Sequence, residues 1–188
     1  MLPALSFQTG TMPRKRKKKT APVIYLSEGP LPQRMAGVFG ASRLVFTDAS
    51  QHHQGGLAAV LFDAWESSPR IACRSVPLNG SNQLELLAGI FGLEQASQHY
   101  PAQSFALFSD NHDAVVRLNR AKIEGLQTDP ELACLLLAAN CSEDTLAHAS
   151  IHWIPGHRTS RGNALADRHA RAAANQLSSP SLPITASA

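Results

Sequence analysis

The stretch from Ile151 to Asp167 constrains the fold more than any other part of the chain. It begins as a short strand pattern, breaks at Pro155-Gly156, continues as a polar loop and becomes an alanine-rich helical run from Asn163. We therefore expect His157 on the loop and Asp167 in the first turns of the last helix. A histidine and a carboxylate placed in this way can face the same cleft, where other carboxylates of the chain can join them.

The chain before this stretch predicts an α/β domain. Three β-rich runs joined by short turns come first and form an antiparallel meander. The whole order, βββαβααβα, predicts a mixed five-stranded sheet, three antiparallel strands then two parallel, with helices on both faces. The first helix should be capped by Ser81 or Asn82. The expected strands are residues 43–48, 57–62, 70–78, 104–109 and 150–154, and the expected helices are residues 81–99, 110–120, 129–140 and 163–177.

Charge divides the chain into a basic leader and a slightly acidic body. Residues 14–19 are all lysine or arginine and supply six of the 17 basic residues, so the other 11 face all 14 acidic residues. Residues 1–40 are rich in proline and show no period, so we expect a disordered or loosely docked leader. A folded domain at 41–177 and a disordered tail at 178–188 should follow. The basic run indicates a nucleic-acid arm or a nuclear import signal, or else a plain solvated tail.

Composition excludes several classes of protein. The chain of 188 residues suits one domain with its own core. No apolar run reaches the roughly 20 residues of a membrane span, and the first residues lack the order of a secretory signal. The three cysteines have no zinc-ligand spacing, and we expect buried free thiols, with Cys134 and Cys141 on one helix face. We therefore expect the protein inside the cell, in the nucleus of a eukaryote or otherwise in the cytoplasm, with no membrane partner.

Four acidic residues occupy special places in this order. Asp48 and Asp110 end the first and fourth strands, Glu85 lies one turn into the first helix, and Asp167 lies in the last. If the first and fourth strands are neighbours, Asp48 and Asp110 lie side by side where such sheets bind ligands. Clustered carboxylates repel one another and need a cation, and an all-oxygen set suits Mg²⁺ or Mn²⁺. Each residue also has a plainer interpretation: Asp110 as a helix N-cap, Asp48 as a turn residue, Glu85 as a solvated charge and Asp167 as the partner of an arginine on its own helix.

These residues stand in motifs that resemble those of the type-one ribonuclease H family. The motifs follow in order over about residues 43–175 and are Phe46-Thr47-Asp48-Ala49-Ser50, Asn82-Gln83-Leu84-Glu85-Leu86-Leu87-Ala88, Phe108-Ser109-Asp110-Asn111, and Gly156-His157 with Gly162-Asn163 and Ala166-Asp167. The last motif is more similar to ribonuclease H domains of retroelement polyproteins than to typical bacterial enzymes. The resemblance implies a ribonuclease H-like fold and a metal-dependent endoribonuclease that cuts the RNA strand of RNA–DNA hybrids.

The resemblance also implies a role for each site residue. Asp48 would bridge two magnesium ions, with Glu85 and Asp110 on one and Asp167 on the other. His157 would assist proton transfer or product departure. The implied substrate-binding residues are Ser50, then Asn82 and Gln83, which match minor-groove contacts, and Asn163, which would orient the scissile phosphate or the His157 loop.

One segment departs from the family pattern. Longer members carry a basic, tryptophan-bearing protrusion after the fourth strand, whereas residues 118–132 hold two basic and three acidic residues and no tryptophan. The body is therefore expected to bind a hybrid weakly by itself. Two other functions stay open, a DNA-directed nuclease of the same fold (a junction resolvase or transposase-like enzyme) and a non-catalytic hybrid-binding module. We expect a monomer, and a past link to a reverse transcriptase domain stays open.

Overall fold

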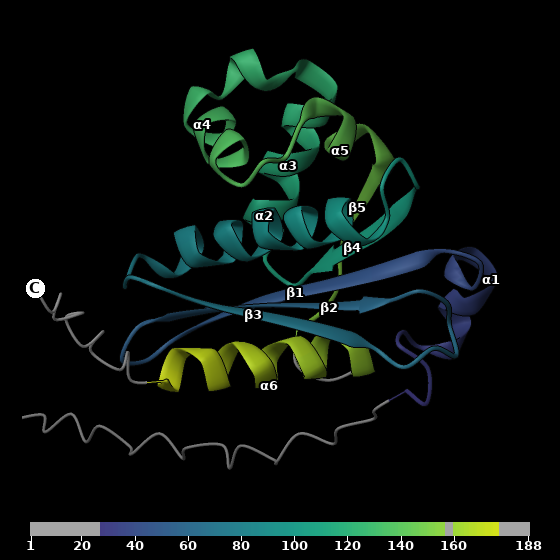
Figure 1. Ribbon diagram of the computed structural model, residues 1–188. Coiled ribbons are helices and arrows are strands. Elements are labelled where there is room, and N and C mark those ends of the chain that lie inside the picture. The colour runs from purple at the N-terminus through teal and green to yellow at the C-terminus, as the bar shows by residue number, and fades with distance from the viewer. Residues whose placement is uncertain (1–26, 157–159, 177–188) are drawn as a thin grey trace, which may run out of the picture.

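The computed structural model describes residues 27–156 and 160–176 and shows a five-stranded sheet between helical layers (Figure 1). The strand order is β3-β2-β1-β4-β5. The first three strands pair antiparallel, whereas β4 runs parallel to both β1 and β5. The predicted mixed sheet is confirmed, and its first and fourth strands are neighbours, which is the condition for Asp48 and Asp110 to lie side by side. The strands are β1 (Arg43–Gln51), β2 (Gly55–Phe62), β3 (Arg70–Val76), β4 (Phe105–Ser109) and β5 (Ala149–Trp153).

Helix α2 crosses one face of the sheet and α6 crosses the other, while α3, α4 and α5 stack beyond α2 (Figure 1). The short helix α5 was not predicted, and Ser142 caps it by accepting a hydrogen bond from the Thr145 amide. None of the described helices has both the length and the apolar character needed to cross a bilayer. The helices are α1 (Ala36–Phe39), α2 (Ser81–His99), α3 (His112–Glu124), α4 (Pro130–Ala138), α5 (Glu143–His148) and α6 (Arg161–Asn175), with 3₁₀ turns η1 (Gln33–Met35) and η2 (Leu126–Thr128).

Alternation along the strands divides the buried side chains into two cores. On β1, Val45 faces the first core, under α2, whereas Leu44 and Phe46 face the second core, on the α6 side. Strands β2 and β4 alternate in the same way, as expected for central strands covered on both faces. The buried side of α6 is lined by small side chains, which let the helix lie close to the sheet. These are Ala166, Ala170, Ala173 and Ala174.

Three helix starts differ from the prediction. Helix α3 begins at His112 and not at Asp110, because the Asn111 side chain caps it. Helix α6 begins at Arg161, two residues before the expected Asn163, because the Ser160 hydroxyl accepts a hydrogen bond from the Asn163 amide at 3.3 Å. At the start of α2, Gly80 occupies the N-cap position without a side-chain hydrogen bond, so the predicted cap at Ser81 or Asn82 is wrong.

The cysteines also differ from the prediction of buried thiols. Cys73 is exposed on the edge strand β3 and Cys134 is exposed on α4, whereas Cys141 is buried. Helix α4 ends at Ala138, so Cys134 and Cys141 do not share a helix face. Burial raises the pKa of the Cys141 thiol to about 12, which keeps this thiol protonated.

Residues 27–40 differ from the disordered or loosely docked leader expected for residues 1–40. They form η1 and α1, and the Leu31 side chain is fully buried in the second core. The Phe39 ring contacts the rings of Phe108 on β4 and His152 on β5, at centroid distances of 5.2 and 5.0 Å. These apolar side chains account for the docking, because they cover β4 and β5 beside α6. The basic run at 14–19 and the tail at 178–188 lie outside the described residues.

Candidate active site

The sheet register brings Asp48 and Asp110 together. Phe46 on β1 pairs with Phe108 on the parallel strand β4, and each aspartate follows two residues later, on the same face of the sheet. Glu85 reaches the same place from one turn into α2. One oxygen of each carboxylate lies within 4.8 Å of the others, and we call these three residues the acidic cluster. The structure thus brings together three of the four carboxylates singled out in the sequence.

Burial and mutual repulsion raise the pKa of two members of the acidic cluster, Asp48 and Glu85. Asp48 is only 3% exposed, and its pKa rises to about 9, first because of burial and then because of Glu85, Asp110 and Asp167. The pKa of Glu85 rises to about 7, again first through burial and then through Asp110. The Ala49 amide donates to Asp48 Oδ1 at 2.9 Å and partly opposes the shift.

Two oxygens of the acidic cluster are buried without a hydrogen-bond partner among the described residues, Asp48 Oδ2 and Glu85 Oε2. Buried polar atoms nearly always have a partner, so these two need a donor or a cation. A hard divalent cation bound by carboxylate oxygens would satisfy both atoms and offset the repulsion. The residues present therefore fit a metal ion.

Asp110 is held by the segments on both sides of residues 157–159. The Asn163 side-chain amide donates to Asp110 Oδ2 at 3.5 Å, and the Trp153 indole donates to the Asp110 carbonyl at 2.9 Å. Gly156 lies so close that a Cβ there would be 2.5 Å from Asp110 Oδ2. The N-cap interpretation of Asp110 is wrong, because Asn111 caps α3 and leaves the Asp110 carboxylate free for the site.

Asp167 lies close to the acidic cluster but is not a member of it. Its charge raises the pKa of both Asp48 and Glu85, so it acts on the same site. Its carboxylate pairs with Arg171 one turn further along α6, at 2.8 Å. The plainer interpretation, an ion pair within the helix, therefore describes Asp167 in this structure.

The other predicted site residues within the described part of the chain lie on β1, α2 and α6. Ser50 lies near the end of β1, and Asn82 and Gln83 lie on the first turn of α2, three and two residues before Glu85. Asn163 is 1% exposed, and its Oδ1 has no hydrogen-bond partner in the described part of the chain. His157 lies outside the described residues. The substrate-binding roles of these residues stay predictions.

Sequence reasoning missed the groups that orient the site. Ser160 precedes the alanine-rich run and could have been found as a helix cap from its residue type. The Trp153 indole and the close approach of Gly156 to Asp110 have no signature in sequence spacing. The carboxylates of the acidic cluster are therefore easier to predict from sequence than the residues that hold Asp110 and the start of α6 in place.

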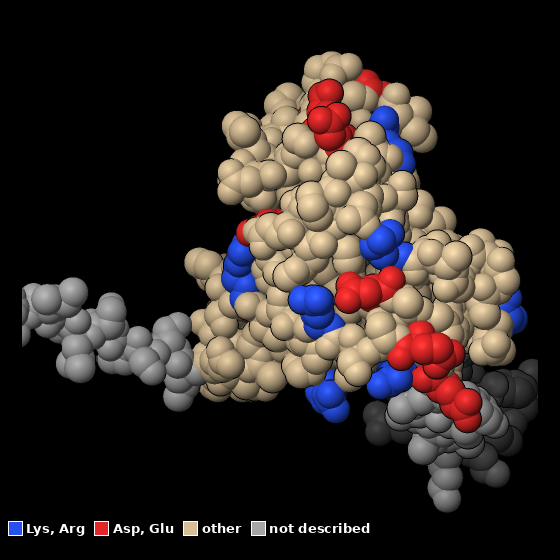
Figure 2. All heavy atoms as spheres, turned by 45° about the vertical axis from the view of Figure 1, so that its right-hand side comes forward, with Lys and Arg blue, Asp and Glu red and all other residues tan. Residues whose placement is uncertain are grey.

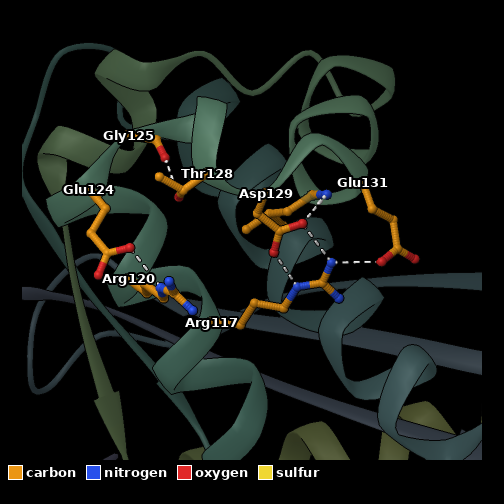
Figure 3. Close-up of polar contacts among 8 residues, drawn as sticks. Arg117, Arg120, Glu124, Gly125, Thr128, Asp129 and Glu131 are labelled. Carbon is orange, nitrogen blue, oxygen red and sulfur yellow. Dashed lines mark hydrogen bonds and ion pairs between the residues drawn. The ribbon is translucent and has the colours of Figure 1, made fainter.

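Five charged residues between positions 117 and 131 form ion pairs with one another (Figure 3). Arg117 forms a bidentate pair with Asp129, at 2.6 and 2.9 Å, and also reaches Glu131 at 2.8 Å. Arg120 pairs with Glu124 at 2.7 Å. Arg117 lowers the pKa of Asp129 to about 2. On the face that Figure 2 shows, Lys and Arg are scattered among apolar, polar and acidic residues and form no continuous basic surface.

A protein-family model and two solved structures are similar to this chain. The RNase H family model matches residues 41–175, and no match was found among curated protein sequences. Among solved structures, RNase H1 from the halophilic archaeon Halobacterium salinarum NRC-1 is 18% identical, with 70% of this chain and 96% of that chain covered and a TM-score of 0.49. LC11-RNase H1 in complex with an RNA/DNA hybrid is 15% identical, with 68% of this chain and 92% of that chain covered and a TM-score of 0.50.

The family match spans all five strands and the acidic cluster. The ribonuclease H-like fold implied by the motifs is confirmed, while the closer likeness to retroelement domains stays a prediction. The chain belongs to the RNase H family.

Proposed function

We propose that the protein is an endoribonuclease that hydrolyses the RNA strand of RNA–DNA hybrids with bound divalent metal. The acidic cluster carries this proposal. It joins two carboxylates at the ends of adjacent parallel strands with a third from α2, and two of the three have a buried oxygen without a partner among the described residues. Family membership supports the same reaction, and one structural relative is itself described in complex with an RNA/DNA hybrid.

The acidic cluster would hold one Mg²⁺ ion, and Asp48 with Asp167 would hold a second; Mn²⁺ suits the same oxygens. Two such ions supply an activated water and stabilise the leaving oxygen of a phosphodiester. Asp167 must loosen its pair with Arg171 to take this role. Asn163 already donates to Asp110, and its free Oδ1 is available to orient the loop or a water at the phosphate.

Ser50, Asn82 and Gln83 would contact the hybrid from the rim of the site. Amide side chains can reach sugar hydroxyls and base edges without reading sequence. His157 would move a proton between the reacting phosphate and solvent, a role that suits a group titrating near neutral pH.

Cleavage of a labelled RNA–DNA hybrid tests the proposal. The purified protein should cut the RNA strand with Mg²⁺ and not with chelator, and should leave duplex RNA, duplex DNA and a four-way junction intact. Cutting of the junction or of duplex DNA instead would favour the DNA-directed nuclease. Tight hybrid binding without cleavage under any metal would favour the non-catalytic module.

The basic run at residues 14–19 should supply much of the affinity for a hybrid, because five of the ten Lys and Arg residues in the described part of the chain already pair with carboxylates. Removing residues 1–20 should weaken binding at low salt and flatten its salt dependence by several units, since each neutralised phosphate adds roughly 0.9 to the slope on duplex DNA. The rate at saturating substrate should stay the same. Equal slopes for the full and shortened chains would leave the run as an import signal or a solvated tail.

Arg117→Ala should lower the free energy of unfolding by about 1–2 kcal/mol, since it removes charged hydrogen bonds to Asp129 and Glu131 in a partly buried place. Hybrid affinity should not change, because these carboxylates already occupy the guanidinium. Urea unfolding and a binding titration measure the two effects, with the exposed Arg34→Ala as the control. A clear loss of affinity at unchanged stability would show that Arg117 contacts the hybrid.

A further inference from the structure

The segment before β1 forms the hydrogen bonds that begin α6. The Pro30 carbonyl accepts two of them, from the Ser160 hydroxyl at 2.7 Å and from the Gly162 amide at 3.0 Å. The Arg161 amide donates to the Ser27 hydroxyl at 3.3 Å. Figure 1 shows this segment, in purple, beside the end of α6 where the helix begins.

These bonds complete the helix cap from a distant part of the chain. The first amides of a helix have no partner within the helix. Here the Asn163 amide is satisfied locally by Ser160, whereas those of Arg161 and Gly162 are satisfied by residues about 130 positions earlier in the sequence. The position of the first turn of α6 therefore depends on residues 27–31.

The segment is fixed to the body by packing on both sides of Pro30. Leu31 is fully buried in the second core, which also contains Phe46. Gly29 lies against the Trp65 ring, where a Cβ would come within 2.5 Å of the indole nitrogen. A segment held this tightly can hold α6 in one position.

The first turn of α6 also contacts the acidic cluster. Asn163 donates a hydrogen bond to Asp110. Gly162 packs against the ring of Phe46, which precedes Asp48 by two residues on β1, and leaves no room there for a Cβ. A shift of this turn would therefore move Asn163 relative to Asp110, and Gly162 relative to the strand that carries Asp48. Asp167 follows one turn later on the same helix.

We propose that residues 27–31 are a positioning segment for the active site: they set the start of α6 and so the placement of Asn163 and Asp167 relative to the acidic cluster. This inference rests on the proposed function. Undocking should act locally, because the alanine-lined side of α6 still packs on the sheet without the segment. The expected result is a misplaced first turn in a folded protein.

Leu31→Asp in the full chain tests the inference, because a buried carboxylate should undock this terminal segment rather than remain in the second core. Val38→Asp places the same charge in α1, seven residues after Leu31 and outside the positioning segment, at a side chain that is 74% exposed. Leu132→Ala removes a fully buried leucine on α4, in the first core, and controls for lost stability. All variants are compared at a temperature where circular dichroism shows them folded.

For Leu31→Asp we expect kcat on a labelled hybrid to fall by about tenfold or more with KM unchanged, since displacements of about 1 Å at a site can cost up to 10²-fold. Hydrogen exchange without metal should speed up at the Gly162 and Asn163 amides and stay unchanged in β1 and β4. Val38→Asp and Leu132→Ala should keep the wild-type kcat.

Two results would overturn the inference: an unchanged kcat in Leu31→Asp despite faster exchange at Gly162, or an equal loss of kcat in Leu132→Ala. The failure of the proposed function looks different, because the wild-type protein itself would then leave the hybrid uncut. The exchange measurement still reports on the docking of residues 27–31 in that case.

Discussion

Asp48→Asn should abolish hybrid cleavage and at the same time raise the melting temperature of the metal-free protein. Asp48 would be a ligand shared by both metal ions, so the amide removes the charge on which both depend. The same substitution removes a buried carboxylate that Glu85 and Asp110 repel. Activity and stability should therefore change in opposite directions.

The stability gain should depend on pH. The pKa of Asp48 is raised to about 9 in the folded protein, whereas an unfolded aspartate titrates near 3.8. Between these values the folded protein holds a proton that the unfolded chain has lost, so the free energy of unfolding falls as pH rises through this window. The advantage of Asp48→Asn should be small at acidic pH and reach about 1–3 kcal/mol above neutral pH.

Thermal melts with chelator across this pH range, together with hybrid cleavage in Mg²⁺, measure both effects. Asp144→Asn, an exposed aspartate in the first turn of α5, is the matched control and should change neither. Substantial residual cleavage by Asp48→Asn would remove the two-metal assignment. A lower melting temperature would mean that the carboxylate stabilises the fold.

Asp110→Asn should leave almost no cleavage, whereas His157→Ala should slow turnover markedly and leave detectable activity. Asp110 belongs to the acidic cluster, and its neutral amide would weaken metal binding. A proton-handling side chain contributes about 10²- to 10⁴-fold and can be partly replaced by water.

Single-turnover rates at saturating Mg²⁺ separate the two roles, and raising the metal concentration should not rescue His157→Ala. His99→Ala, at the exposed end of α2, is the control histidine. Equal and complete losses in Asp110→Asn and His157→Ala would place His157 among the groups that hold the metal.

The sheet could be predicted because strand periodicity and turns depend on many residues at once. All five strands lie where the patterns place them, while the order β3-β2-β1-β4-β5 comes from the structure. That order alone places Asp48 beside Asp110. The carboxylates of the acidic cluster were accessible from sequence, whereas their meeting at one place depended on this order.

The features that the sequence did not reveal depend on single contacts. The start of α6 is decided by one hydroxyl, that of Ser160, and by one carbonyl, that of Pro30. Backbone carbonyls carry no residue-type signature, and a proline-rich stretch without a period gives no sign that it docks. Cys134 is exposed because α4 buries Leu132 and Leu136 instead, and Cys141 does not share a face with it because α4 ends at Ala138.

The docking of Ser27 beside Arg161 also determines where the leader leaves the body. Lys19, the last residue of the basic run, is only eight positions before Ser27, so even a fully extended connection spans at most about 28 Å. Arg14, the first residue of the run, is 13 positions before Ser27, so chain length limits all six positive charges to about 47 Å from that point. A tether of this length would raise their effective concentration for a polyanion bound at the acidic cluster. A tethered cation of this kind can hold a substrate during turnover without being part of the rigid binding surface.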